Sequence, residues 1–361
     1  MLQWSSDDGY ETASSYDCSI ESLKSSINQY ILENGRRYHT YFGSNRNLMP
    51  TDEMEQDRLD MHHEIFLGVL HGALHMAPLK PEKIERIMDV GTGTGIWAID
   101  MADRFPHAEV MGIDLSPIQP TWVPPNCHFE VDDAEQDWTY DADYFDYIHV
   151  RNVALNITKW PHLLAETYRC TKPGGYVELA EVSGDIIADD DTVPPGHPLK
   201  LSWDYLSKAM ELTGHDPIYS NTLAERLTEA GFVDVKSFRV KQPIGGWPQD
   251  SKLKVIGEMM LLNIQLGLEA YCLAAFTRVL GMATGDASAL LKEASVRACD
   301  RGMHAYNYFY IAYGRKQKDG EFSDEDDDED SDEDYGSDES AEYDDASEST
   351  EKPKRTGDME E

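Results

Sequence analysis

Short apolar runs alternate with longer amphipathic stretches over the middle of the chain, between residues 84 and 182. The short runs are rich in β-branched and aromatic side chains and predict strands at residues 87–90, 109–116, 127–131, 145–150 and 176–182. The stretches between them carry apolar residues at helical spacing, so this part of the chain predicts the βαβ rhythm of a parallel sheet. Two later apolar runs, which begin at Gly231 and Ala305, predict a sixth and a seventh strand.

The hydrophobic pattern on either side of this core predicts helices. Residues 26–80 are expected to form a helical cap, with a short helix over 29–37 and a longer one that starts at Thr51 or Asp52. The apolar positions of the longer helix are expected to pack on the sheet: Ile65, Phe66, Val69, Leu70 and Leu74. Helices are also expected around residues 199–212 and 221–230, and within a long insert at about 245–303. Such an insert serves as a lid or substrate wall, or else as an extra packing layer or dimer surface.

Charge divides the chain into segments. The 361 residues carry a formal net charge of −37, of which residues 321–361 carry −18. We therefore expect a flexible N-terminus over 1–25, the helical cap over 26–80, a main domain over 81–318 and a disordered acidic tail over 319–361. Like charges repel one another in this tail, and it offers almost no apolar surface to bury.

Composition also disfavours several partners. Residues 1–320 still carry −19, and an acidic surface disfavours direct binding of nucleic acid. The most apolar segment, 255–283, contains too many polar side chains to span a bilayer, so no membrane partner is expected. The five cysteines show neither paired nor zinc-binding spacing, which predicts no metal site and the reduced thiols of an intracellular protein. A short basic run at 352–355 leaves nucleus and cytoplasm both open.

The run from Asp89 to Gly95 carries the strongest chemical signal. It follows the first strand with the spacing D-x-G-x-G-x-G, through Gly91 and Gly93, and leads into an apolar helix. Glycines allow a sharp turn close to a ligand, and the spacing differs from the G-x-G-x-x-G of dinucleotide-binding loops. Asp114 ends the second strand about 20 residues further on, where nucleotide-binding folds place a carboxylate for the ribose hydroxyls. The alternatives are a tight turn without a ligand and, for Asp114, a helix cap.

These motifs resemble those of the class I S-adenosylmethionine-dependent methyltransferases. In that family the glycines pass under the methionine part of the cofactor, and the acid, here Asp89, anchors the loop and the amino end of the cofactor. The segment 132–135 is similar to the family's G-D-A turn, which implies that Asp133 bonds the adenine amino group and that Ala134 lies along the adenine. Because Asp132 stands where glycine is usual, the choice between the two carboxylates stays open.

The N-terminal segment resembles a narrower family, the fungal LaeA-like methyltransferases. The matching phrases are ENGRRYHTY at 33–41, PTDEMEQDRLDMHH at 50–63, DDAEQDW, FDYIHVRN and KPGGYVELAE. The resemblance implies an α/β, Rossmann-like class I fold: a mostly parallel seven-stranded sheet with an antiparallel C-terminal hairpin, N-terminal helices and a helical lid insert. It also implies S-adenosyl-L-methionine as cofactor and a role in fungal secondary metabolism. Some members act as nuclear regulators with velvet-type proteins, whereas others belong to biosynthetic gene clusters.

Candidates for catalysis lie where the strands end. His149 and Glu181 are the expected catalytic residues, and the ordinary pKa of a histidine suits proton transfer near neutrality. Arg151, on the same side of its strand as His149, is expected to pair with a carboxylate of the cofactor or of the adenine turn. A histidine on a strand is also commonly a hydrogen-bonded core residue. The N-terminal segment offers aromatic side chains that would cover the cofactor: Tyr38, His39 and Tyr41.

Two classes of function stay open at this point. The first is an active methyltransferase whose acceptor is a small-molecule metabolite or a protein. The second is a nuclear regulator of secondary-metabolite genes that acts through a protein complex, with catalysis secondary. The chain has His-Val-Arg-Asn at 149–152, where enzymes that methylate nucleic-acid amino groups carry Asn/Asp-Pro-Pro-Tyr/Phe, so a nucleic-acid acceptor is disfavoured.

Overall fold

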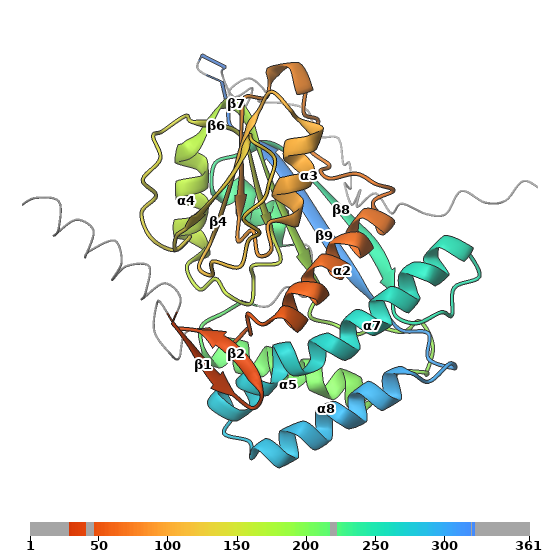
Figure 1. Ribbon diagram of the computed structural model, residues 1–361. Helices are drawn as coiled ribbons and strands as arrows, with labels where there is room; N and C mark the ends of the chain where they lie inside the picture. Colours follow the sequence, from red (N-terminus) through yellow and green to blue (C-terminus); the bar gives the residue numbers. More distant parts are fainter. Residues whose placement is uncertain (1–28, 41–46, 217–221, 319, 322–361) are drawn as a thin grey trace, which may run out of the picture.

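The computed structural model describes residues 29–40, 47–216, 222–318 and 320–321. The chain forms two units, a sheet with helices in the upper part of Figure 1 and a group of helices below it. The predicted flexible N-terminus, 1–25, lies outside the described residues, as does the predicted acidic tail, 319–361, apart from residues 320–321. The expectations about both termini therefore stay predictions.

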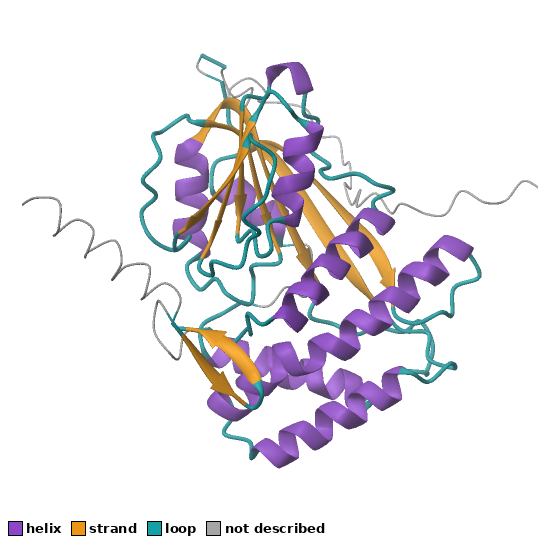
Figure 2. Cartoon of the chain, in the orientation of Figure 1, coloured by secondary structure: helices purple, strands orange, loops and turns teal. Residues whose placement is uncertain are grey.

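A seven-stranded sheet forms the upper unit, in the order β5-β4-β3-β6-β7-β9-β8. Its strands are drawn as orange arrows in the upper part of Figure 2. Its strands are β3 (Arg86–Val90), β4 (Glu109–Asp114), β5 (Cys127–Val131), β6 (Phe145–Arg151), β7 (Thr171–Val182), β8 (Val233–Pro243) and β9 (Tyr306–Arg315). The first five strands pair in parallel, whereas β9 runs antiparallel to both β7 and β8. The predicted mostly parallel sheet with an antiparallel C-terminal hairpin is confirmed.

Helices cover both faces of this sheet, as expected for parallel strands that are apolar on both sides. The helix α3 (Ile96–Arg104) covers one face, and α4 (Trp160–Cys170) with α6 (Leu223–Glu229) covers the other. Neighbouring residues of β3 show the alternation: Ile87 packs in the apolar cluster of α3, and Met88 packs in that of α4 and α6. The carboxyl ends of β3, β4, β5 and β6 are thereby held at one edge of the sheet.

The lower unit is helical, and the long insert supplies much of it. Its helices are α2 (Glu53–Val69), α5 (Pro198–Leu212), α7 (Ser251–Ala274), the π-helical turn η2 (Ala275–Val279) and α8 (Thr284–Ala298). The short helix η1 (Pro81–Lys83) directly precedes β3 at the amino end of the sheet. In Figure 1, α2 crosses between the sheet and α7. Phe66 of α2 stacks on Phe309 of β9 with ring centroids 4.3 Å apart, and Ile65 and Val69 are buried in the same cluster as α5, α7 and α8. The helix α2 thus packs on the sheet, as expected, and also on the helices of the insert.

One helical stretch among the described residues, Ser251–Val279, has the length and apolar composition of a membrane span. Of its most apolar window, however, 61% is buried inside the molecule. The stretch packs against α2, α5, α8 and β8, and such burial is typical of a core helix.

The predicted short helix over 29–37 is wrong. These residues form a hairpin of β1 (Tyr30–Glu33) and β2 (Arg36–His39), which lies at the lower left of Figure 1. Asn34 and Gly35 make the turn, with φ angles of +51° and +80°. An Asn-Gly pair between extended residues is the strongest short-range signal for a two-residue hairpin turn. The sequence therefore contains a signal that favours a hairpin over the predicted helix.

Asp52 joins this hairpin to α2. Its carboxylate accepts a hydrogen bond from the backbone N–H of Glu55, which is the helix cap expected from the sequence. The same carboxylate accepts two hydrogen bonds from Arg36 of β2, from Nε and from Nη2, each 2.8 Å long. Because the Arg36 side chain is buried, loss of this partner would leave a charge in the interior.

We predict that Asp52→Ala lowers the free energy of unfolding by about 3 kcal/mol, because it removes a cap and leaves buried Arg36 unpaired. Asp250→Ala is the matched control, since Asp250 caps α7 through the N–H groups of Lys252 and Leu253 and is exposed. This control should cost only about 1 kcal/mol. Urea unfolding of the two variants measures both values, and equal losses would show that the Arg36 pair adds nothing to stability.

Candidate active site

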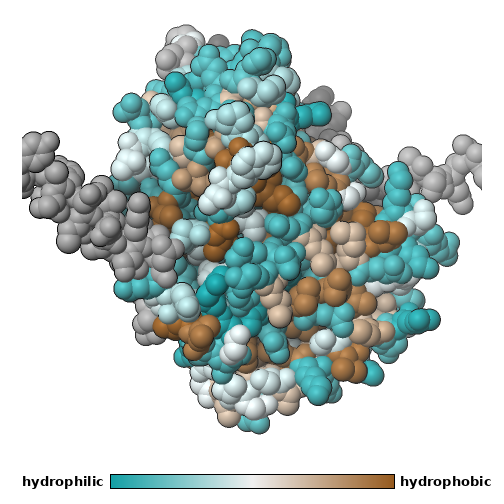
Figure 3. Space-filling view, in the orientation of Figure 1, coloured by the Kyte–Doolittle hydropathy of each residue, from teal (hydrophilic) through white to brown (hydrophobic). Residues whose placement is uncertain are grey.

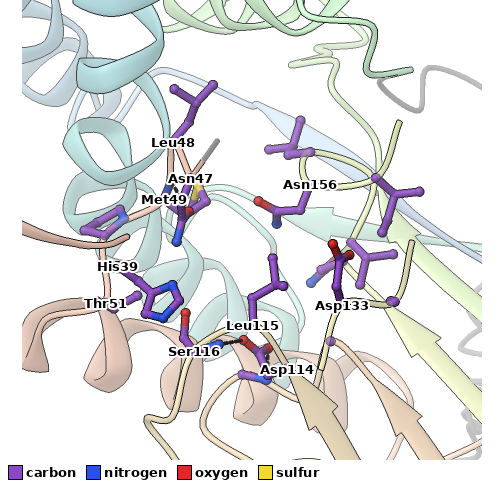
Figure 4. A pocket seen from close by; sticks show the side chains of 18 of the residues that line it. His39, Asn47, Leu48, Met49, Thr51, Asp114, Leu115, Ser116, Asp133 and Asn156 are labelled. Atoms are coloured by element: carbon purple, nitrogen blue, oxygen red, sulfur yellow. Dashed lines mark hydrogen bonds between the residues drawn. The ribbon is translucent and has the colours of Figure 1, made fainter. Parts of the chain in front are cut away.

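A cavity of about 650 Å³ lies at the carboxyl ends of β3, β4, β5 and β6, where open α/β sheets bind their ligands. The loops that follow these strands contribute one wall, with Gly91, Gly93, Asp114, Asp133 and Asn152. The opposite wall comes from β2, α2 and the end of the insert. Figure 4 shows side chains of both walls around a shared space. The sheet and the helical unit thus meet at this pocket.

The glycine loop after β3 is held from within. The carboxylate of Asp89 accepts a hydrogen bond of 2.6 Å from the hydroxyl of Thr92 and lies 2.8 Å from Nδ1 of His149 on β6. Asp89 is only 3% exposed and does not line the pocket. The structure therefore has Asp89 anchoring the loop, as the resemblance implies, but gives it no contact with the space beside the loop.

The predicted glycines divide into two groups. Gly93 lines the pocket with a φ of +60°, and a Cβ built there would meet only the side chain of Leu59, at 3.7 Å. Gly95 has a φ of +82° at the start of α3, and a Cβ there would lie 2.3 Å from the ring of Phe129. Gly95 is therefore required by packing and lies outside the pocket wall. Gly91 and Gly93 both line the pocket, but a Cβ at Gly91 would lie 2.6 Å from Val153, so only Gly93 has open space beside its Cα.

Asp114 faces the pocket at the end of β4. One oxygen accepts a hydrogen bond from the backbone N–H of Gly93 and the other from that of Ser116, both 2.8 Å long. Burial raises the pKa of the Asp114 carboxyl to about 6. Each oxygen retains a second lone pair, so the group can accept further hydrogen bonds from two neighbouring hydroxyls.

The predicted adenine turn also lines the pocket, through Asp132, Asp133 and Ala134. Asp133 is 5% exposed and accepts hydrogen bonds from the N–H of Glu135 and the side chain of Gln136. Asp132 accepts one from the N–H of Asp133, and burial raises the pKa of its carboxyl. The structure thus brings Asp114 and both candidate carboxylates to one cavity.

Comparison with known proteins adds an independent finding. A family model described as a methyltransferase domain matches residues 61–237. Methyltransferase pytC of Aspergillus terreus is 38% identical over 301 residues, which cover 83% of this chain and 92% of that protein. Secondary metabolism regulator LAE1 of Cochliobolus heterostrophus is 37% identical over 294 residues, 80% of this chain and 95% of that protein. Protein-methionine methyltransferase laeA of Emericella nidulans is 33% identical over 298 residues, 82% of this chain and 79% of that protein.

The chain belongs to the LaeA-like methyltransferases. Its cofactor is S-adenosyl-L-methionine, and the family resemblance stated from the motifs is confirmed. The pocket fits this cofactor, because the backbone at Gly93 is open and Asp114 offers acceptors to a ribose. Gly91, Gly93, Asp114, Asp133 and Ala134 would hold it, and when bound it supplies a methyl group that its sulfonium activates.

Two predicted site residues of this methyltransferase, His149 and Arg151, lie outside the pocket wall. His149 is 2% exposed, stacks on Trp97 of α3 with ring centroids 3.7 Å apart, and touches Asp89. Burial lowers the pKa of His149 to about 4. Arg151 donates a hydrogen bond of 3.1 Å to Nδ1 of His63 and lies over the ring of Phe66. Both side chains thus support the glycine loop and α2, and neither touches the pocket.

The predicted catalytic residue Glu181 also lies outside the wall of the main pocket. Its Oε1 accepts hydrogen bonds from the backbone N–H groups of Val153 and Ala154, 2.8 Å and 3.1 Å long. It is 3% exposed, and burial raises the pKa of its carboxyl to about 8. Glu181 therefore fixes the loop after β6 and lines a smaller cavity behind the main pocket.

Sequence reasoning missed the wall opposite the sheet. Arg58 of α2 is fully buried and donates two hydrogen bonds to Glu55, 2.9 Å and 2.7 Å long, and one to Asn263 of α7. Its guanidinium lies 4.7 Å from the ring centre of Tyr271. Arg58, Glu55 and Tyr271 all line the pocket. The motif at 50–63 contained two of them, but only the fold brings the third beside them.

Two imidazoles line the pocket, those of His39 and His215. His39 was predicted only as a cover for the cofactor, together with Tyr38, which is buried beside Arg278, and Tyr41, which lies outside the described residues. His215 contacts the hydroxyl of Thr213 at 2.8 Å, and burial lowers the pKa of its ring. A neutral imidazole at the pocket can accept a proton.

We predict that Asp114→Asn weakens binding of S-adenosylhomocysteine by about 1.5–3 kcal/mol, because a carboxylate is a stronger acceptor for ribose hydroxyls than an amide. The wild-type affinity should fall as the pH is lowered through about 6, where the Asp114 carboxyl becomes protonated, and the variant should lack this step. Calorimetry between pH 5 and 8 measures both effects.

The matched control is Asp146→Asn. Asp146 likewise accepts two backbone N–H bonds, from Glu85 and Arg86, but does not line the pocket. It should lose stability and keep its affinity for the cofactor. If Asp114→Asn behaves in the same way, Asp114 is a structural cap and the ribose role is wrong.

A second prediction concerns pH and stability. The pKa of Glu181 is about 8 in the folded chain and about 4.3 when unfolded, so the unfolded chain loses this proton first as the pH rises. Folding stability should therefore decrease between pH 5 and 8 on account of this group. Glu181→Gln removes the ionisable carboxyl and with it this pH dependence. The melting temperature of the variant minus that of wild type should therefore rise steadily from pH 5 to 8. Parallel curves for the two proteins would show that Glu181 is ionised throughout.

Proposed function

We propose that this enzyme methylates a small-molecule metabolite that binds in the half of the pocket opposite the cofactor loops. We call this part the acceptor half; it is lined by His39, Leu48, Met49, Leu155, Thr213, His215, Tyr271 and Val279. The observation that carries the proposal is that these side chains and the cofactor loops line one continuous cavity. An acceptor held there lies beside the place where the methyl group is delivered.

The chemistry of the acceptor half supports an organic acceptor that is mostly apolar. Aliphatic and aromatic side chains predominate among these eight residues, while the Glu55–Arg58 pair and Arg278 line the same side of the pocket. An apolar surface with a few polar groups is the usual composition of a small-molecule site. The cavity of about 650 Å³ falls in the size range of such sites. The enzyme's own contribution is to align the acceptor with the methyl group and to exclude water.

The two imidazoles supply the proton chemistry that some acceptors need. A phenol or a carboxylic acid must lose its proton when it is methylated, and a positioned base assists this step. His215 is held neutral by burial, which suits it as the base. His39 enters from the hairpin side of the cavity (Figure 4).

A protein acceptor is the second candidate, because relatives at 33–37% identity are named as secondary metabolism regulators and one as a protein-methionine methyltransferase. In this case the chain would act in the nucleus with a velvet-type partner, and catalysis would serve regulation. The basic run at 352–355, which favours import, lies outside the described residues.

Tritiated S-adenosylmethionine distinguishes the two acceptors. The purified enzyme is incubated with the small-molecule filtrate and, separately, with the protein fraction of cells that lack its gene. We predict that label enters the organic extract of the filtrate and that one methylated compound accounts for it. Label found only in precipitated protein would overturn the proposal and favour the regulator.

The control for these assays is a pair of glycine variants. Gly93→Val places methyl groups in the cofactor space, whereas Gly72→Val introduces the same residue at a φ of +84° with nothing within 4 Å. Both variants carry backbone strain, but only Gly93→Val should abolish labelling. Equal losses in the two would mean that strain, and not the cofactor contact, explains the effect.

A further inference from the structure

A second cavity of about 80 Å³ lies behind the main pocket, and we call it the inner chamber. Its wall comes from α2, β7, α5, α7 and β9, and includes Glu181, the residue predicted to be catalytic. Three residues line both cavities: Asn152, Leu155 and Tyr271. These three residues therefore stand at the boundary between the chamber and the main pocket.

Three side chains of the chamber wall carry buried polar atoms that have no hydrogen-bond partner among the described residues. These atoms are Nε2 of His62, Nε1 of Trp203 and Oδ1 of Asn307. In native interiors nearly all such atoms are paired, and each exception needs an explanation. Three of the eleven such exceptions among the described residues belong to side chains of this one cavity wall, where water or a bound group would complete their hydrogen bonds.

The types of these atoms define the group that fits. The indole of Trp203 only donates, the Oδ1 of Asn307 only accepts, and a neutral imidazole such as His62 does either. Burial lowers the pKa of His62 well below its usual value, so its ring is neutral. A carboxylate can only accept and an ammonium can only donate, so neither satisfies both Trp203 and Asn307. An amide or a hydroxyl satisfies both.

Asn152 lies between the chamber and the glycine loop of the cofactor site. This residue follows β6 directly, has a left-handed φ of +55°, and accepts a hydrogen bond from the N–H of Val182. The next residue, Val153, lies so close to the glycine loop that a Cβ at Gly91 would approach it to 2.6 Å. The boundary between the chamber and the main pocket at Asn152 therefore lies beside the loop expected to carry the methionine part of the cofactor.

We propose that the inner chamber is a subsite for the methyl acceptor and holds a neutral group of that molecule that both donates and accepts hydrogen bonds. This inference rests on the proposed small-molecule acceptor and names the chemistry of one end of it. The chamber has room for a few waters or for a group the size of acetamide. The rest of the acceptor lies in the acceptor half, with its reacting atom near Asn152.

The indole N–H of Trp203 reports on this chamber directly. The chain has seven tryptophans, and Trp203→Phe identifies the relevant signal in the ¹H–¹⁵N spectrum of the full chain. Acetamide and propan-2-ol should shift that signal in a saturable way, whereas acetate and ethylammonium should not. The indole signals of Trp97 and Trp247, which donate to backbone carbonyls elsewhere, serve as internal controls. No shift with any probe, or an equal shift with the ions, would overturn the proposal.

A matched pair of variants tests the location. Ser207 lines the chamber, and Ser202 is buried on the same helix, α5, outside it. Ser207→Val should weaken acetamide binding at Trp203 by about tenfold or more by filling the cavity, and Ser202→Val should leave it unchanged. If both variants bind acetamide like wild type, the probe is not in the chamber.

The outcome is separable from that of the proposed function. The titration requires neither turnover nor cofactor, so a shift at Trp203 stands even if the tritium experiment finds a protein acceptor. Conversely, if label enters a small molecule but no probe shifts the Trp203 signal, the subsite proposal is wrong and the proposed small-molecule acceptor stands.

Discussion

The carboxylate of Asp89 ties the glycine loop to the strand beside it. One oxygen accepts a hydrogen bond from the hydroxyl of Thr92 within the loop, and the other lies 2.8 Å from Nδ1 of His149 on β6, whose ring stacks on Trp97 of α3. Strand, loop, neighbouring strand and helix are thus fixed around one buried charge. Asp114 holds the other side of the loop through the N–H of Gly93. The wall that receives the cofactor is therefore formed before the cofactor arrives.

The opposite wall depends on contacts between distant parts of the chain. Arg58 and Asn263 are 205 residues apart in sequence, and Arg278 pairs with Glu33 over a separation of 245 residues. These contacts join the N-terminal segment to the insert, so the acceptor half exists only when both have folded onto the sheet. The cofactor wall, in contrast, is built from consecutive βα units. The two halves of the pocket can accordingly change separately among relatives of this fold.

The sequence predicts the sheet well because buried parallel strands are nearly continuous apolar runs with turns between them. It also locates the glycine loop, Asp114 and the adenine turn, since these follow strand ends at fixed offsets. Alternation along β6 gives the shared face of His149 and Arg151 correctly, but not that Trp97 and Phe66 cover them. Whether a side chain reaches a pocket depends on what packs over it, and that information is not local. For the same reason Gly95 matched the motif while its actual neighbour is Phe129.

The π-helical turn η2 between α7 and the wall of the pocket has a consequence for how the site can diverge. The turn ends the helix that begins as α7, because residues 280–283 are not helical. Within the turn Phe276 is buried in the core, while Arg278 lies over the ring of Tyr38 and donates a hydrogen bond to the carbonyl of Asn47. A change in length of one residue here falls at the end of the helix, so it moves Arg278 in the pocket wall and leaves the core contacts of α7 in place.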